Sequence, residues 1–365
     1  MKKYMKIFDK AFEKKKSICL IGDYGIGKSA IVYQYAEKKS KQLNRKLIIW
    51  HELSENEKYE VINNIENYFV VVDIKLQSVG DISKLTGIPI IINGGEHKVI
   101  WQPPLFVKVL CHPKSAGLFF LDEVNMALPS LQSTAFEITL QRKVGEWKLS
   151  DKILIVCAGN PIDVNISANP IPKPLLNRLL LINATVPSTD EWLEWAISKN
   201  LDERVIAFVK LFEELHKNSE EELEQSTRPR SYELLSDMIK GENDIEFIRT
   251  CAYGYLHKVT ASKFIKFIEI QQKLDYKQYL ENPEKVKELN NEEKYALITI
   301  LVQKFEKIDT KKLVELIKVM ADDVLELSAV TISLIKSKYG YNAVKSAIIA
   351  QLPQELKNRI LELVI

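Results

Sequence analysis

The stretch Gly22-Asp23-Tyr24-Gly25-Ile26-Gly27-Lys28-Ser29 decides the fold expected for this chain. It follows a short apolar run, Ser17–Ile21, and its end begins a segment of helical periodicity that reaches about Gln42. A strand, a glycine-rich loop and a helix in this order form a phosphate-binding loop, in which backbone N–H groups and the helix N-terminus surround phosphate oxygens. We expect Lys28 to reach the β- and γ-phosphates and Ser29 to offer its hydroxyl to Mg²⁺. The predicted nucleotide contacts are Gly22, Asp23, Tyr24, Gly25, Ile26, Gly27, Lys28, Ser29 and Ala30.

Apolar runs alternate with helical segments through the first half of the chain. The runs that we interpret as buried strands are Ser17–Ile21, Leu47–Trp50, Phe69–Val72, Phe119–Leu121 and Ile153–Val156. This alternation predicts an α/β fold, an αβα sandwich of the P-loop NTPase type with a parallel sheet covered on both faces. Ligands of such sheets bind at the carboxyl ends of the strands, and in this sequence polar residues follow those ends.

The character of the sequence changes beyond about Pro187, where apolar residues recur at helical spacing up to the C-terminus. The polar segment Asp275–Asn291, which contains Pro283, predicts a break within this region. We therefore expect three domains: a nucleotide-binding α/β domain over 1–187, an all-helical lid over 188–272 and a helical C-terminal extension over 273–365.

Composition narrows the class of protein. The chain has 365 residues, which favours two or three domains, and 46% of them are hydrophobic. Its 51 Lys and Arg residues nearly balance 49 Asp and Glu residues, so no overall basic field attracts nucleic acid, although a local basic patch remains compatible with these counts. The sequence shows no signal-like segment and no apolar run long enough for a membrane span, so we expect a cytoplasmic protein without membrane contact.

The cysteines and histidines show no metal-ligand spacing. Cys19 and Cys157 lie inside apolar runs and are expected to be buried thiols in a reducing compartment.

A second motif, Gly117-Leu-Phe-Phe-Leu-Asp122-Glu123, is an apolar strand that ends in two carboxylates. We expect Asp122 to hold Mg²⁺ through its water shell and Glu123 to polarise the attacking water as a general base. The alternative is a surface acidic pair at the start of the next helix. The preceding phosphate-binding loop favours the catalytic interpretation.

Three further residues are weaker candidates for the site. For each of them the sequence leaves a structural interpretation open beside the functional one. Asn160, after a core strand, could orient the lytic water or could begin a turn before Pro161. Arg178 could reach the γ-phosphate of a neighbouring subunit or could be an ordinary surface arginine. Arg230, placed at a helix start by Pro229, could contact phosphate or only solvent.

Together these segments resemble the AAA+ ATPases, in the MoxR-like branch that also includes dynein-related and restriction-motor ATPases. The resemblance covers roughly residues 15–260. Beyond the two phosphate-site motifs it rests on Leu85–Pro89, Trp101–Pro104, Asp122–Asn125 followed by Pro129, Gln132 and Ser133, the hairpin segment Gln141–Leu149, Leu175–Arg178 and Glu191–Trp195. The chain departs from the pattern at Lys84, Met126 and Leu179, and at Asp23 and Tyr24 in the loop.

The resemblance implies a role for each matching residue. Lys28 and Ser29 correspond to Walker A, Asp122 and Glu123 to Walker B, Asn160 to sensor 1, Arg178 to the arginine finger that acts across a subunit boundary, and Arg230, rather than Arg228, to sensor 2. It also implies ATP and Mg²⁺ as cofactors and a homo-oligomeric, hexameric ring. The implied activity is ATP-driven, chaperone-like remodelling of a protein partner, with a von Willebrand factor A domain protein as one such partner.

Two other functions remain open at this stage. A monomeric nucleotide switch or a small-molecule kinase would share the loop, but the sequence has no Asn-Lys-x-Asp motif for guanine and no recognisable acceptor lid. A nucleic-acid motor could use Arg142, Lys143 and Lys148 on the hairpin segment to touch its substrate, or these could be solvated charges.

Overall fold

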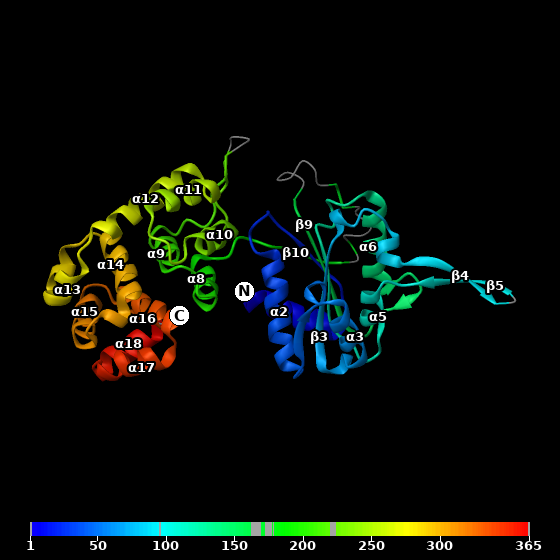
Figure 1. Cartoon of the computed structure of the whole chain (residues 1–365), viewed down its shortest axis with the longest axis horizontal. Helices are drawn as coiled ribbons and strands as arrows, with labels where there is room; N and C mark the ends of the chain where they lie inside the picture. The colour runs from blue at the N-terminus through cyan, green and yellow to red at the C-terminus, as the bar shows by residue number, and fades with distance from the viewer. Residues whose placement is uncertain are drawn as a thin grey trace. The chain divides into compact units, whose positions relative to one another are not determined.

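The computed structural model describes residues 2–94, 96–161, 169–171, 177, 179–219 and 224–363. The chain divides into two compact units, Met1–Thr185 and Val186–Ile365, and each is described by itself. Figure 1 shows the first unit in blue to green and the second in green to red. In the described residues, no helix combines the length and the apolar character that a membrane crossing needs.

The first unit contains a six-stranded sheet in the order β10-β1-β9-β6-β3-β2, and all neighbouring strands run parallel. The strands are β1 (Ile18–Ile21), β2 (Lys46–Ile49), β3 (Tyr68–Lys75), β6 (Ala116–Asp122), β9 (Lys152–Gly159) and β10 (Leu180–Asn183). Five of them overlap the apolar runs predicted as strands, with Ser17 and Trp50 of those runs outside β1 and β2, whereas the edge strand β10 was not predicted. The unit has the α/β fold of P-loop NTPases.

Alternate residues of the strands face opposite layers of helices. Ile18 and Leu20 pack in a cluster with helices α1 (Lys2–Lys14) and α2 (Lys28–Gln42). Cys19, between them, packs in the cluster of the other face. The helices of that face are α3 (Glu55–Asn63), α5 (Leu105–Cys111) and α6 (Pro129–Gln141), and a short helix α4 spans Ser83–Thr86. Both faces of the sheet are therefore covered, as expected for parallel strands.

Two antiparallel hairpins lie outside this sheet. β4 (Ile88–Gly94) pairs with β5 (Glu96–Gln102) and extends away from the body of the unit in Figure 1. Its side chains include exposed apolar groups, among them Ile91 and Trp101. The second hairpin, β7 (Lys143–Val144) with β8 (Trp147–Lys148), lies within the segment that the family resemblance predicted as a hairpin.

The second unit is helical in its described residues. Its helices are α8 (Thr189–Ser198), α9 (Glu203–Phe212), α10 (Pro229–Ile239), α11 (Ile245–Tyr255), α12 (Lys258–Lys273), α13 (Tyr276–Glu281), α14 (Asn291–Lys304), α15 (Thr310–Asp323), α16 (Leu325–Tyr339), α17 (Tyr341–Ala347) and α18 (Gln354–Leu363). The segment predicted as a break holds α13 and a 3₁₀ helix, Pro283–Glu288, and its Tyr279, Leu280 and Val286 are buried in the core. The predicted division into a lid and an extension stays a prediction.

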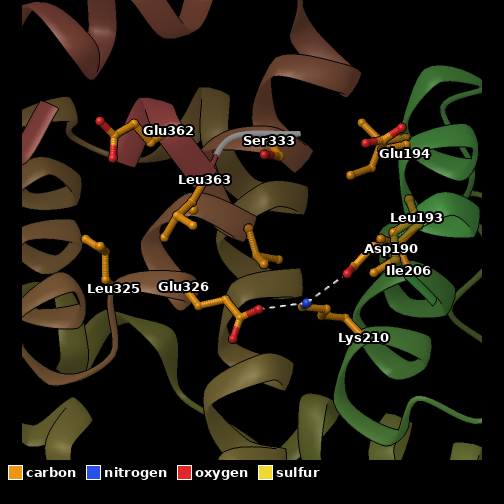
Figure 2. A pocket seen from close by; sticks show the side chains of 13 residues that line it. Asp190, Leu193, Glu194, Ile206, Lys210, Leu325, Glu326, Ser333, Glu362 and Leu363 are labelled. Carbon is orange, nitrogen blue, oxygen red and sulfur yellow. Dashed lines mark ion pairs between the residues drawn. The ribbon is translucent and has the colours of Figure 1, made fainter. Parts of the chain in front are cut away.

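A pocket of about 620 Å³ lies among α8, α9, α16 and α18 of this unit. Its walls are mainly apolar, and the ammonium of Lys210 lies between the carboxylates of Glu326, at 2.7 Å, and Asp190, at 3.5 Å (Figure 2). The residues that line this pocket include none of the predicted nucleotide contacts.

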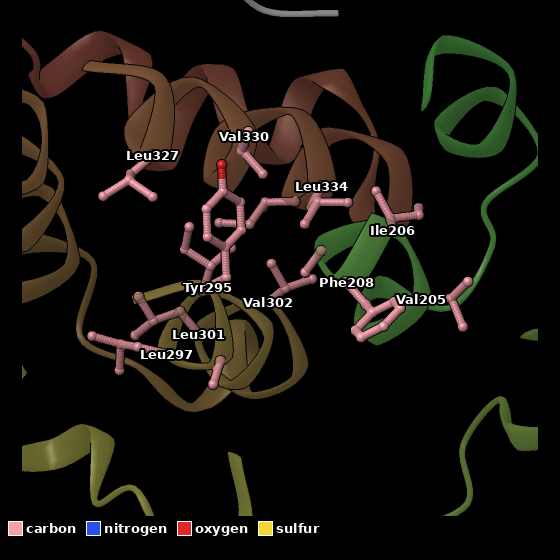
Figure 3. Close-up of a cluster of buried hydrophobic side chains, with 14 of the residues drawn as sticks. Val205, Ile206, Phe208, Tyr295, Leu297, Leu301, Val302, Leu327, Val330 and Leu334 are labelled. Carbon is pink, nitrogen blue, oxygen red and sulfur yellow. The ribbon is translucent and has the colours of Figure 1, made fainter. Parts of the chain in front are cut away.

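One buried hydrophobic cluster extends through the helical unit. Figure 3 shows part of it, with Phe208 of α9, Val302 of α14 and Leu334 of α16 in the same cluster. Phe208 also packs edge-on against Phe264 of α12, with ring centroids 5.2 Å apart. These contacts join helices on both sides of the segment predicted as a break.

Gly117 lies where the central strand β6 passes close to β3. A Cβ atom added there would lie 1.9 Å from the carbonyl oxygen of Val70 on β3, which is its register partner. Neither β3 nor β6 can shift freely, because each pairs with a second strand. A side chain at residue 117 is therefore incompatible with the sheet as it stands.

We expect Gly117→Ala to destabilise the chain by about 3 kcal/mol, the upper part of the usual range for overpacking a core. Gly254→Ala on α11 is the matched control, because a Cβ there meets nothing within 4 Å and alanine favours a helix. Urea unfolding followed by circular dichroism measures both. Equal midpoints for the two variants would contradict the close approach at Gly117.

Candidate active site

The strand order brings the predicted site residues to one edge of the sheet. Strand β9 lies between β1, which leads into the phosphate-binding loop, and β6, which ends at Asp122. Ile21 pairs with Gly159, and Leu121 pairs with Cys157. Because the strands are parallel, Gly22, Asn160 and Asp122 all follow or end strands at the same edge, as the sequence predicted.

The backbone of the loop adopts conformations and close approaches that glycine allows. A Cβ on Gly22 would lie 2.5 Å from the carbonyl oxygen of Ala184, so the chain passes too close there for a side chain. Gly25 and Gly27 adopt φ angles of 68° and 98°, a region that other residues rarely enter. Gly27 is the N-cap of α2, and the helix begins at Lys28. The N-terminus of α2 therefore lies at the loop, where it favours an anion.

The Lys28 side chain makes three hydrogen bonds. Its side-chain ammonium is largely buried and donates to the carbonyl oxygens of Gly22 and Asp23, both at 2.7 Å, and to Oδ1 of Asn160 at 2.8 Å. Burial lowers its pKa, and the negative charge of Asp122 is the largest of the effects that oppose this shift. A phosphate oxygen at Lys28 would compete with these acceptors, which would couple phosphate binding to the position of Asn160.

Ser29 and Asp122 form the other side of the site. The Ser29 hydroxyl donates to Oδ2 of Asp122 at 3.1 Å, which links the start of α2 to the end of β6. A hydroxyl and a carboxylate are the hard oxygen donors that Mg²⁺ takes, together with phosphate oxygens and water. The described residues contain no cluster of three or more His, Cys, Asp or Glu that would hold a metal alone. The pair fits a Mg²⁺ ion that arrives with a nucleotide.

Glu123 lies in a strained turn directly after β6. Its φ angle is 55°, the left-handed region that is unfavourable for a residue with a Cβ. Three bonds hold this turn: the N–H of Glu123 donates to Oδ1 of Asp122 at 2.9 Å, that of Val124 to the carbonyl oxygen of Ala158 at 2.9 Å, and that of Met126 to the carbonyl oxygen of Glu123 at 3.0 Å. Strain held by its surroundings is common where a side chain must be aimed at a substrate.

Asn125 is a site residue that sequence reasoning missed. Its side chain, almost fully buried, donates to the carbonyl oxygen of Asn160 at 2.6 Å and accepts from the N–H of Asn160 at 3.1 Å. A Cβ on Gly159 would lie 2.7 Å from Oδ1 of Asn125, so the glycine makes room for this contact. The sequence does contain a glycine at the end of a buried strand, Gly159, and an asparagine after the acidic motif, Asn125. No sequence pattern indicates that these two residues are in contact. Asn125 fixes the backbone that carries Asn160.

The predicted arginines have different outcomes. Arg178 lies outside the described residues. Arg228 is buried, and its guanidinium donates to the carbonyl oxygens of Lys217 and Thr227 and to Oδ1 of Asn218. Arg230 is exposed in the first turn of α10. Arg228 is thus held by acceptors within its own unit, and the choice of Arg230 as the phosphate contact stays a prediction.

The three hairpin residues considered for nucleic-acid contact also differ in their surroundings. Lys143 and Lys148 are register partners and both are exposed. Arg142 instead donates to the carbonyl oxygens of Ser150 at 2.9 Å and Ile153 at 2.6 Å. Of the two alternatives left open for Arg142, these bonds to backbone carbonyls support a structural role, and contact with a substrate stays untested.

Comparisons with known proteins add the following. No protein-family model and no curated protein sequence matches this chain. Similar solved structures include a candidate ATPase from Cytophaga hutchinsonii (14% identity, TM-score 0.34, 72% of this chain and 78% of that one) and Cdc6p from Pyrobaculum aerophilum (12%, 0.33, 88% of each). The ORC2 protein of Aeropyrum pernix is also similar (11%, 0.35, 100% of this chain and 93% of that one). Identities and TM-scores this low carry no function from one protein to another, so function is inferred from the site.

Asn125→Ala tests the support of Asn160. We expect nucleotide turnover to fall about ten-fold, equivalent to about 1.4 kcal/mol in the barrier, because Asn160 loses both bonds that fix its backbone. Nucleotide affinity should change little, since Lys28 and the loop remain. Asn64→Ala, which removes an exposed side-chain bond at the end of α3, is the control. Normal turnover in a folded Asn125→Ala protein would show that Asn160 needs no such support.

Proposed function

We propose that this chain is an ATP hydrolase of the AAA+ class that uses Mg²⁺. The observation that carries the proposal is the hydrogen-bonded connection of four predicted residues at one sheet edge: Lys28 to Asn160, and Ser29 to Asp122. A glycine-rich turn without the chemistry would not need these side chains to meet. The Walker motifs alone would fit any nucleoside triphosphate as the substrate. The choice of ATP follows from the family resemblance.

The proposed mechanism assigns one task to each residue. The loop N–H groups and the Lys28 ammonium bind and orient the β- and γ-phosphates. Ser29 and Asp122 would hold Mg²⁺, which would offset negative charge on the phosphate oxygens. The Glu123 carboxylate takes a proton from the attacking water, and the Asn160 amide orients that water. Asn125 and the bonds of the turn after β6 keep these two side chains positioned before the reaction.

The finer part of the proposal concerns assembly. Arg178, from a neighbouring subunit, and Arg230, from the helical lid, would complete the site, so the active form would be a ring, a hexamer by family expectation. The work done would be chaperone-like remodelling of a protein partner, for example one with a von Willebrand factor A domain. The support is the sequence resemblance, together with the exposure of Arg230. Location in the cytoplasm stays a prediction.

Substitutions can test separately the roles proposed for the Glu123 carboxylate and for the Lys28 ammonium. Glu123→Gln should bind ATP with near-normal affinity yet hydrolyse it at least about a hundred-fold more slowly, because the amide cannot take the proton. Lys28→Ala should lose affinity itself. Titration with a fluorescent ATP analogue and a phosphate-release assay measure the two quantities. Unchanged affinity in Lys28→Ala, or full turnover in Glu123→Gln, would contradict the corresponding role.

A mixing experiment tests whether Arg178 acts in a neighbouring subunit. Arg178→Ala should bind ATP but turn over about a thousand-fold more slowly, as for loss of an arginine finger. Mixed with Glu123→Gln, it should regain activity, because a site that keeps its Glu123 then receives Arg178 from the other variant. The double variant Glu123→Gln/Arg178→Ala is the matched control and should not restore turnover. Absence of rescue with the single variant would exclude action across subunits.

A further inference from the structure

The pocket of the helical unit is separate from the candidate active site (Figure 2). Its volume of about 620 Å³ lies within the range of roughly 300–1,000 Å³ that is usual for pockets holding small molecules, which often lie between helices. Helices α8 and α9 belong to the predicted lid, and α16 and α18 belong to the predicted extension. A molecule bound there would contact both of these parts of the unit.

The inner wall of the pocket is apolar. Leu193, Ile206, Ala329 and Val330 line it, and none of them is more than 8% exposed. Water in such a space finds few hydrogen-bond partners, and transfer of an apolar group from water to an apolar wall is favourable. The wall therefore fits the hydrocarbon part of a ligand.

The charged residues that line the pocket are mostly acidic. They are Asp190, Glu194, Glu326, Glu362 and Lys210, which together carry a formal net charge of −3. The Lys210 ammonium is already bound to Glu326 and Asp190. Burial lowers the pKa of Lys210, but the hydrogen bond to Glu326 and the charges of Glu326 and Asp190 outweigh burial and raise it, so this lysine stays charged and paired.

Glu194 and Glu362 are the two carboxylates that Lys210 does not reach. Both residues are exposed, and in the part of the chain that the structure describes neither side chain makes an ion pair or a hydrogen bond. Glu194 comes from α8 and Glu362 from α18, and they lie on opposite sides of the pocket in Figure 2. A cation that entered between them would gain two carboxylates as partners.

We propose that this pocket binds a small apolar organic cation. The hydrocarbon part of an amine would cover the inner wall, and its ammonium would lie between Glu194 and Glu362. The net charge of the lining residues opposes an anion, and a neutral ligand gains nothing from the two carboxylates. The proposal does not depend on nucleotide binding or hydrolysis, because the pocket contains none of the residues assigned to them.

The test compares three probes of similar shape and different charge: naphthylmethylamine, naphthylmethanol and naphthylacetate. Isothermal titration calorimetry of the whole chain, without nucleotide, measures the affinity for each. The amine should bind about ten-fold more tightly than the alcohol, since it adds two partly exposed ion pairs. The acetate should bind most weakly, because its charge has the same sign as the rim of the pocket.

A double variant locates the charge effect. Glu194→Gln/Glu362→Gln removes both rim charges and nearly keeps the side-chain shapes, so affinity for the amine should fall about ten-fold, to that of the alcohol. Affinity for the alcohol should not change. Glu281→Gln/Glu355→Gln is the matched control, because these exposed glutamates of α13 and α18 do not line the pocket. It should bind all three probes as the wild type does.

Three results would overturn the proposal. The first is no detectable binding of the amine in the millimolar range, and the second is equal affinity for the three probes. The third is an equal loss of affinity in the two double variants, since overall charge would then explain the preference. Ala329→Leu, which fills the inner wall, should weaken both amine and alcohol, and unchanged binding in that folded variant would also overturn the proposal. Should it not fold, as judged by circular dichroism, the glutamine variants decide.

Discussion

The buried ammonium of Lys28 is the constraint on which the sheet edge depends. A charge removed from water must be matched by hydrogen bonds, or the folded state loses several kcal/mol. Lys28 has three N–H groups, and each has an acceptor: the carbonyls of Gly22 and Asp23 and the amide oxygen of Asn160. Two acceptors follow β1 and the third follows β9, so this arrangement requires β1 and β9 to be neighbours. The strand order is thus part of the chemistry of the site.

A second set of bonds extends this arrangement to β6. Asn160 is held at its side chain by Lys28 and at its backbone by Asn125, which belongs to the turn after β6. In the same turn, Val124 is bound to Ala158 of β9, and Asp122 is bound to Ser29 of α2. The groups proposed to act on water and on metal are therefore fixed to one another across three strands. Fixed dipoles and charges need no reorganisation when a reaction begins, which is the usual source of electrostatic catalysis.

The sequence predicted the parts of this unit whose signals are local. The central strands are runs of apolar residues buried on both faces, such as Ile153–Val156 within β9, and the loop glycines have backbone angles that glycine favours. Strand β10 was missed although it is as short as the predicted edge strand β2, and its Leu180 and Leu181 are each 43% exposed, unlike the buried runs of the central strands. Asn125 was missed for another reason: its partner is the backbone of a residue 35 positions away, and no periodicity reports such a bond. The position of Arg230 relative to the loop depends on how the two units are arranged. No local sequence pattern encodes that arrangement.

Lys28 and Arg142 show why residue type alone does not identify a functional cation. Both are partly or largely buried, both donate to carbonyl oxygens, and burial lowers the pKa of each. The acceptors of Arg142 are backbone carbonyls at the start of β9, Ser150 and Ile153, where they attach the hairpin to the sheet. Those of Lys28 lie at the other end of β9 and in a loop, and one of them is a side chain that can turn toward a different donor. A phosphate could therefore replace an acceptor of Lys28 without breaking strand pairing, whereas both bonds of Arg142 Nη2 go to backbone carbonyls that hold the hairpin against the sheet.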